Sequence, residues 1–101
     1  MVYVSGRLGI DPATGKMVEG TIADRTTQIL GNIAEILKAA GSSLDNVVKI
    51  NIFITDMQNF SAMNEAYTKA FKTGVKPVRT CVAVKELPQG TDVEIEATAH
   101  M

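Results

Sequence analysis

The stretch NVVKINIFIT, residues 46–55, is the strongest strand pattern in this chain of 101 residues and decides the fold. Aliphatic side chains occupy its even positions, which are Val48, Ile50, Ile52 and Ile54. A mixed set occupies its odd positions, which are Val47, Lys49, Asn51, Phe53 and Thr55. Because side chains in a strand alternate between two faces, this pattern predicts one face in the core and one mixed face.

Helix patterns lie on both sides of this strand. Over residues 21–40, apolar side chains recur every three or four positions, as they do on one face of a helix. Thr21 and Asp24 have the spacing of a capping box, and Gly41 follows as a C-terminal stop. A second amphipathic pattern covers residues 56–72. We therefore predict two helices, each with a single apolar stripe.

Further strand patterns complete the order of elements. They cover residues 2–8, 78–85 and 92–99, and turn residues fill 11–20 and 86–91. The order is β-α-β-α-β-β, within a single domain over the whole chain. Two helices with one apolar stripe each can cover one face of one sheet. The sequence thus predicts an α+β two-layer sandwich, a mixed sheet with both helices on one face.

The second face of this sheet carries charge. If the last two strands form an antiparallel hairpin, Arg79 and Cys81 lie on one face, away from the helices. The carboxylates on that same face are then Glu94 and Glu96. One interpretation is a solvated face with weak ion pairs. The other is a subunit interface that buries side chains such as Phe53, which predicts an oligomer.

Composition disfavours several classes of partner. Ten basic and eleven acidic residues leave a net charge of −1, which gives no electrostatic reason to expect nucleic acid or an anionic membrane. No apolar run approaches the roughly 18 residues that span a bilayer. The N-terminus resembles no signal peptide, and one cysteine allows no intrachain disulfide. We expect a cytoplasmic protein, with the mitochondrial matrix as the alternative.

Four segments are similar, in order and spacing, to the RidA (YjgF/L-PSP) family. They are VYVSGRLGIDPATGKMVEG, ILGNIAEILKAAGSSLDNVVKINIFITDMQNFSAMNEAYTKAF, KPVRTCVAV and VEIEATA. The resemblance implies a chorismate-mutase-like fold that assembles as a homotrimer with clefts between subunits. It also implies hydrolysis of reactive 2-enamine and 2-imine acids, such as 2-aminoacrylate, to 2-keto acids and ammonia. Neither a cofactor nor a metal is implied.

The resemblance assigns roles residue by residue. Arg79 matches the arginine that grips the substrate carboxylate, a role that suits the planar guanidinium. Glu94 matches the glutamate that holds or activates the attacking water. The residues implied to bind substrate are Ser5, Gly6, Phe60, Asn64 and Cys81. At Cys81 the backbone is expected to matter more than the thiol.

The chain also departs from the family pattern. Family members usually carry a further segment before the equivalent of Val2, with a strand and a tyrosine that reaches the site. We therefore expect one sheet edge and one pocket wall to be absent. Arg7 stands where glutamine is common, and Thr80 where serine is common. Two other functions stay open: a ligand-binding or regulatory trimer without turnover, and a ribonuclease or translation inhibitor, which the net charge of −1 disfavours.

Overall fold

The computed structural model describes residues 1–72 and 74–101 and has the predicted order of main elements. Its helices and strands are β1 (Val2–Arg7), β2 (Ile10–Asp11), β3 (Lys16–Met17), α1 (Ile22–Ala39), β4 (Val47–Ile54), α2 (Phe60–Ala70), β5 (Val78–Ala83) and β6 (Val93–Ala99). Short 3-10 turns cover Leu44–Asn46, Met57–Asn59 and Pro88–Gly90. In the described part of the chain, no helix has both the length and the apolar character needed to cross a bilayer.

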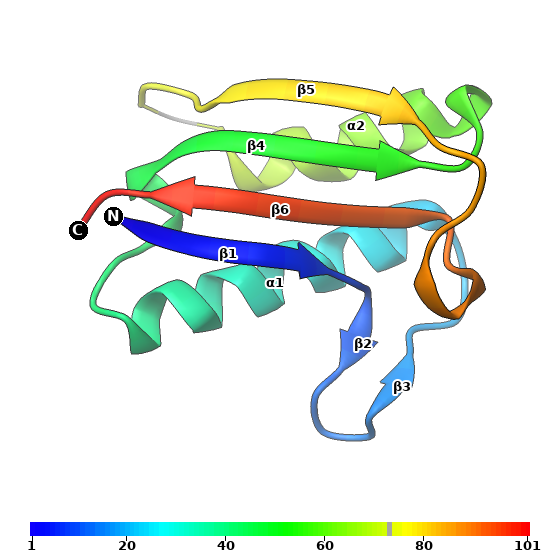
Figure 1. The fold of residues 1–101 in the computed structure, drawn as a ribbon, viewed down its shortest axis with the longest axis horizontal. Helices are drawn as coiled ribbons and strands as arrows, with labels where there is room; N and C mark the ends of the chain where they lie inside the picture. Colours follow the sequence, from blue (N-terminus) through cyan, green and yellow to red (C-terminus); the bar gives the residue numbers. More distant parts are fainter. Residues whose placement is uncertain (73) are drawn as a thin grey trace.

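The main sheet has the strand order β1-β6-β4-β5, and both helices cover one of its faces (Figure 1). β6 is antiparallel to β1 and to β4, whereas β5 is parallel to β4. The predicted sandwich is confirmed, but the predicted hairpin of the last two strands is wrong. Parallel neighbours need a crossover connection, and α2 provides one between β4 and β5. β6 is therefore left to pair on the other side of β4.

The helix ends follow local chemistry. At the start of α1, the Thr21 hydroxyl accepts a hydrogen bond from the Asp24 amide at 3.2 Å, and the Asp24 carboxylate accepts one from the Thr21 amide at 3.0 Å. This capping box was predicted, as was the stop at Gly41, which has φ 83°. Asp56 instead caps the 3-10 turn before α2, where its carboxylate accepts from the Gln58 amide. The second helix is accordingly shorter than predicted.

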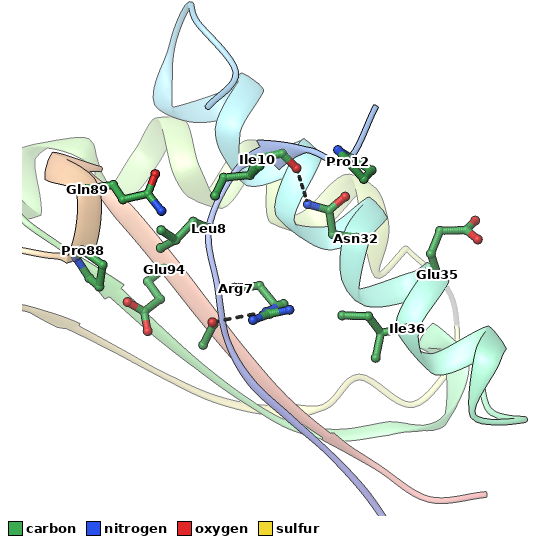
Figure 2. A pocket seen from close by; sticks show the side chains of 11 residues that line it. Arg7, Leu8, Ile10, Pro12, Asn32, Glu35, Ile36, Pro88, Gln89 and Glu94 are labelled. Atoms are coloured by element: carbon green, nitrogen blue, oxygen red, sulfur yellow. Dashed lines mark hydrogen bonds between the residues drawn. The ribbon is translucent and has the colours of Figure 1, made fainter. Parts of the chain in front are cut away.

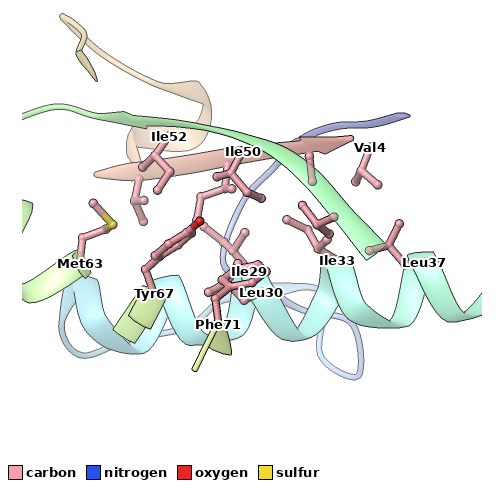
Figure 3. Packing of buried hydrophobic residues seen from close by; sticks show 14 of the residues in the cluster. Val4, Ile29, Leu30, Ile33, Leu37, Ile50, Ile52, Met63, Tyr67 and Phe71 are labelled. Atoms are coloured by element: carbon pink, nitrogen blue, oxygen red, sulfur yellow. The ribbon is translucent and has the colours of Figure 1, made fainter. Parts of the chain in front are cut away.

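The core lies between the helices and the sheet. Figure 3 shows the apolar residues of α1 and α2 pointing at β4, where Ile50, Ile52 and Ile54 are fully buried. At the start of β4 the predicted alternation fails, because Val47 is 4% exposed and Val48 is 40% exposed. The register of β4 against β6 shifts at this point, which turns Val47 into the core.

Candidate functional site

Arg79 and Cys81 lie on the helix-covered face of the sheet. In the parallel register of β4 and β5, Arg79 is paired with Ile50 and Cys81 with Ile52, and paired residues point to the same side. Both isoleucines are buried under the helices. The prediction that Arg79 and Cys81 share a face with the glutamates of β6 is therefore wrong. The prediction assumed that β5 pairs with β6. In the structure β5 pairs with β4, which places Arg79 and Cys81 on the opposite face from Glu94 and Glu96.

The Arg79 side chain lies between β5 and one face of α2. Its guanidinium carbon is 4.7 Å from the centre of the Tyr67 ring and 5.5 Å from that of Phe60, and its Nη1 donates a hydrogen bond to Asn64 Oδ1. In the described part of the chain, no carboxylate lies within ion-pair distance of Arg79. The rings stabilise the cation and restrict its plane, while donors remain for an external anion.

These contacts bring together three of the predicted site residues and one that the sequence reading missed. Phe60, Asn64 and Tyr67 follow each other at intervals of four and three, so they share one helix face. Tyr67 falls within the amphipathic pattern predicted over residues 56–72, but it was not among the predicted site residues. The signal that could have found it is this spacing relative to the predicted residues Phe60 and Asn64.

Cys81 lies two residues after Arg79 and packs partly against the core. Burial raises the pKa of its thiol, and the positive charge of Arg79 opposes that effect to a smaller extent. The thiol is therefore protonated at neutral pH, which is the opposite of what a cysteine nucleophile needs. Its position next to Arg79 agrees with a lining residue.

Glu94 lies on the other face of the sheet, paired with Phe53 of β4. A side chain at Gly6 would overlap the Glu94 carboxylate, so glycine is what lets the carboxylate rest against β1. Ser5 and Gly6 occupy the irregularity in the pairing of β1 with β6. Gly6 thus adjoins Glu94, whereas Ser5 lines a neighbouring hollow on the same face with Glu96.

A cavity of about 570 Å³ opens beside Glu94 and Gly6. Figure 2 shows Glu94, Pro88, Gln89 and Leu8 on one side of the β1 chain, with residues of α1 on the other. Asn32 of α1 donates a hydrogen bond to the Ile10 carbonyl at 2.8 Å and so anchors the segment after β1. No sequence signal pointed to Gln89, because its orientation depends on the unusual backbone of its turn.

No helix of the described residues covers the sheet face that carries Glu94 (Figure 1). Cross-strand pairs place Lys49 beside Val78, Asn51 beside Thr80 and Phe53 beside Val82 on this outer face. Tyr3, Val78 and Val82 are large apolar side chains exposed there. The Asn51 amide donates to Glu96 at 2.8 Å. Within one chain, Arg79 and Glu94 thus lie on opposite faces of the sheet.

Comparisons with known proteins identify a family and relatives that match nearly the whole chain. The family model described as endoribonuclease L-PSP matches residues 1–101. Protein HMF1 of Saccharomyces cerevisiae is 48% identical over 99 residues, which make up 98% of this chain and 75% of that protein. The 2-iminobutanoate/2-iminopropanoate deaminase of Bos taurus is 46% identical over 98 residues, 97% of this chain and 71% of that protein.

A solved structure shows the same architecture. The crystal structure of E. coli TdcF with bound serine superposes with a TM-score of 0.91 at 35% sequence identity, covering 96% of this chain and 78% of that one. Nearly the whole present chain is matched in each comparison, together with about three quarters of each relative.

Proposed function

The chain belongs to the L-PSP family, and a similar bovine protein is named 2-iminobutanoate/2-iminopropanoate deaminase, so we propose that it hydrolyses 2-imino acids. The products are a 2-keto acid and ammonia, and enamines such as 2-aminoacrylate enter as the imine tautomer. The observation that carries the proposal is Arg79, a half-buried guanidinium without a carboxylate partner in the described residues. Such a group is a receptor for a small carboxylate ligand.

Arg79 fixes the substrate by its carboxylate. Asn64 and the rings of Tyr67 and Phe60 hold the guanidinium before any ligand arrives. A planar guanidinium can bind a carboxylate through two parallel hydrogen bonds, which also sets the plane of the attached imine. A fixed plane presents the imine carbon to water in one orientation, which lowers the entropic part of the barrier.

Glu94 acts on the water. As the water oxygen bonds to the imine carbon, Glu94 accepts a proton and then passes it to the nitrogen. The carbinolamine that forms then loses its hydroxyl proton, which Glu94 transfers to the same nitrogen. The carbon–nitrogen bond breaks, ammonia leaves, and the carbon keeps the oxygen as the keto group. Water is the only co-reactant that this balance needs.

The two roles require two copies of the chain, because Arg79 and Glu94 are on opposite faces of one sheet. We propose that Arg79 of one copy meets Glu94 of the next in a homotrimer. The exposed apolar side chains of the outer face, including Tyr3 and Val82, support an interface there. Small 2-imino and 2-keto acids are the proposed ligands.

Subunit complementation tests both the function and the shared site. Arg79→Ala and Glu94→Gln chains are each assayed for turnover of an imine formed in situ, and then unfolded, mixed in equal amounts and refolded. Each variant alone should be inactive. In random mixed trimers, roughly a quarter of the sites combine an intact Arg79 with an intact Glu94, so activity should return to about that fraction.

Two results would contradict this scheme. A mixture as inactive as its components would mean that the site does not take Arg79 and Glu94 from different copies. Wild-type protein that does not accelerate imine hydrolysis would remove the deaminase function. In that case the ligand-binding trimer is the better candidate, which the serine bound to the similar TdcF favours. A ribonuclease remains disfavoured by the net charge of −1.

A further inference from the structure

Gln89 has an unusual backbone conformation next to Glu94. With φ 58° and ψ 20°, it is the one residue other than glycine with positive φ in the described part of the chain. Side chains of L-residues make this left-handed region costly, and glycine or asparagine adopts it more readily. A residue held in such a conformation is a reason to ask what its side chain does.

The turn around Gln89 is held firmly at both ends. The Gly90 amide donates to the Leu87 carbonyl at 3.2 Å, and the Thr91 amide donates to the Pro88 carbonyl at 3.3 Å. Thr91 is buried, and the Asp92 carboxylate that follows is bound to Arg25. The backbone of Gln89 is therefore fixed by its neighbours and does not depend on its own side chain.

The side chain of Gln89 contributes a carboxamide to the lining of the cavity. Figure 2 shows the Gln89 side chain extending into the space that Glu94 and Leu8 also line. Gln89 is exposed, and no side-chain hydrogen bond among the described residues involves its carboxamide, which can therefore donate and accept. Leu8 and Pro88 make the adjacent wall apolar.

The orientation of the bound substrate follows from the proposed function, and the inference about Gln89 rests on that function. The substrate carboxylate binds Arg79, and the imine carbon lies next to Glu94. The remaining substituent of that carbon is the side chain of the imino acid. The cavity of about 570 Å³ adjoins Glu94 and is the space into which this side chain extends.

We propose that Gln89 determines specificity by hydrogen-bonding a polar group on the substrate side chain. Imino acids whose side chains donate or accept a hydrogen bond are then favoured over aliphatic ones of the same size. A site that offers a hydrogen bond discriminates against an analogue that cannot use it, since the group in the site is left unpaired. Gln89 touches the side chain only and takes no part in the chemical step.

The test compares two imino acids with nearly isosteric side chains, formed in situ by an amino-acid oxidase from asparagine and leucine. In Gln89→Gly, the ratio of kcat/KM for the asparagine-derived imine to that for the leucine-derived imine should fall about three- to tenfold, the effect of one neutral hydrogen bond. The fall should come from a lower kcat/KM for the asparagine-derived imine. Asparagine tolerates the same backbone and has a shorter carboxamide. The ratio of kcat/KM in Gln89→Asn should therefore lie between those of the wild type and Gln89→Gly.

The controls separate specificity from folding. Gln58→Ala removes an exposed glutamine from another turn and should leave the ratio unchanged. The melting temperature of Gln89→Gly should be no lower than that of the wild type, because glycine suits this backbone. An unchanged ratio in Gln89→Gly overturns the assignment.

Calorimetry with the two matching 2-keto acids provides a second readout that does not need turnover. If the wild type fails to hydrolyse either imine, the proposed reaction fails, yet the ratio of the two dissociation constants still tests Gln89. A ratio of the dissociation constant of the asparagine-derived keto acid to that of the leucine-derived keto acid that rises in Gln89→Gly supports the assignment, and an equal ratio in both proteins removes it.

Discussion

The bond between Arg25 and Asp92 gives the sharpest stability prediction. Arg25 Nε donates to one Asp92 carboxylate oxygen and Nη2 to the other, both at 2.7 Å, and the two side chains are 17% and 25% exposed. Arg25 Nη1 also donates to the Gly20 carbonyl at 3.1 Å. The pair thus joins α1, the segment before it and the residue that precedes β6. Asp92→Asn removes the charge from this junction with little change in shape.

The loss of folding stability expected for Asp92→Asn lies between two limits. Exposed ion pairs contribute about 0–1 kcal/mol, while removing one partner of a fully buried pair costs about 3–5 kcal/mol. A partly exposed pair with two parallel hydrogen bonds falls between them, so Asp92→Asn should lower the free energy of unfolding by about 2 kcal/mol. For a domain of this size, that corresponds to a fall in melting temperature of about 8–16 °C.

The effect should depend on pH in a definite direction. The hydrogen bonds from Arg25 lower the pKa of the Asp92 carboxyl below its ordinary value, and the same bonds raise the pKa of Arg25. A lowered carboxyl pKa stabilises the folded state above the unfolded pKa of about 3.9, and this stability is lost as the pH falls further. The difference between wild type and Asp92→Asn should be constant from pH 7 to about 5 and shrink below about 4.

Urea unfolding at pH 7, 5 and 3.5 measures this difference. Asp45→Asn is the matched control, because Asp45 is an exposed aspartate in the 3-10 turn before β4. It should change the free energy of unfolding by less than about 0.5 kcal/mol. Equal effects of the two substitutions at pH 7, or a difference that grows as the pH falls, would refute the role given to the Arg25–Asp92 pair.

Three further substitutions test individual contacts. The Thr26 hydroxyl is buried without a partner in the described residues, so Thr26→Val should raise the free energy of unfolding by about 1 kcal/mol in urea titrations; a loss would imply an unseen partner. Gly6→Ala should leave the circular dichroism spectrum intact but displace the Glu94 carboxylate and lower imine turnover at least about tenfold, and unchanged turnover would argue against the position of that carboxylate. Cys81→Ala should keep most activity, because burial raises the pKa of the thiol; a hundredfold loss, about 3 kcal/mol, would contradict this.

Local patterns in the sequence predicted the elements of the fold well. The apolar repeat of α1, its capping box at Thr21 and the alternation over Ile50, Ile52 and Ile54 each depend on residues close together in the chain. Such patterns state which face of an element is buried. They do not state which strands are neighbours, because pairing depends on contacts between residues that are distant in sequence.

The position of Arg79 shows the consequence of this gap. Its own strand has no fully buried residue, since Arg79 and Cys81 are only partly buried and Val78, Thr80 and Val82 between and beside them are exposed in the single chain. Without a clear buried face, the side on which Arg79 lies follows from the strand that β5 joins. The pairing with β4 puts Arg79 under α2, where Tyr67 stacks on it. The resemblance to the family assigns Arg79 to the proposed role, which stays a prediction, whereas the pattern of the strand misplaced the residue.

The separation of Arg79 from Glu94 connects assembly to chemistry in the proposed enzyme. A guanidinium left without a carboxylate would be costly in a dry interior, and the rings of Tyr67 and Phe60 offset part of that cost within one chain. If Glu94 lay beside Arg79 on the same face, an ion pair between them would occupy donors of the guanidinium that a substrate carboxylate needs. Placing them on opposite faces prevents this pairing in the monomer. In the proposed trimer, Arg79 and Glu94 approach each other only across the cleft between two copies, where the substrate carboxylate binds the donors of Arg79.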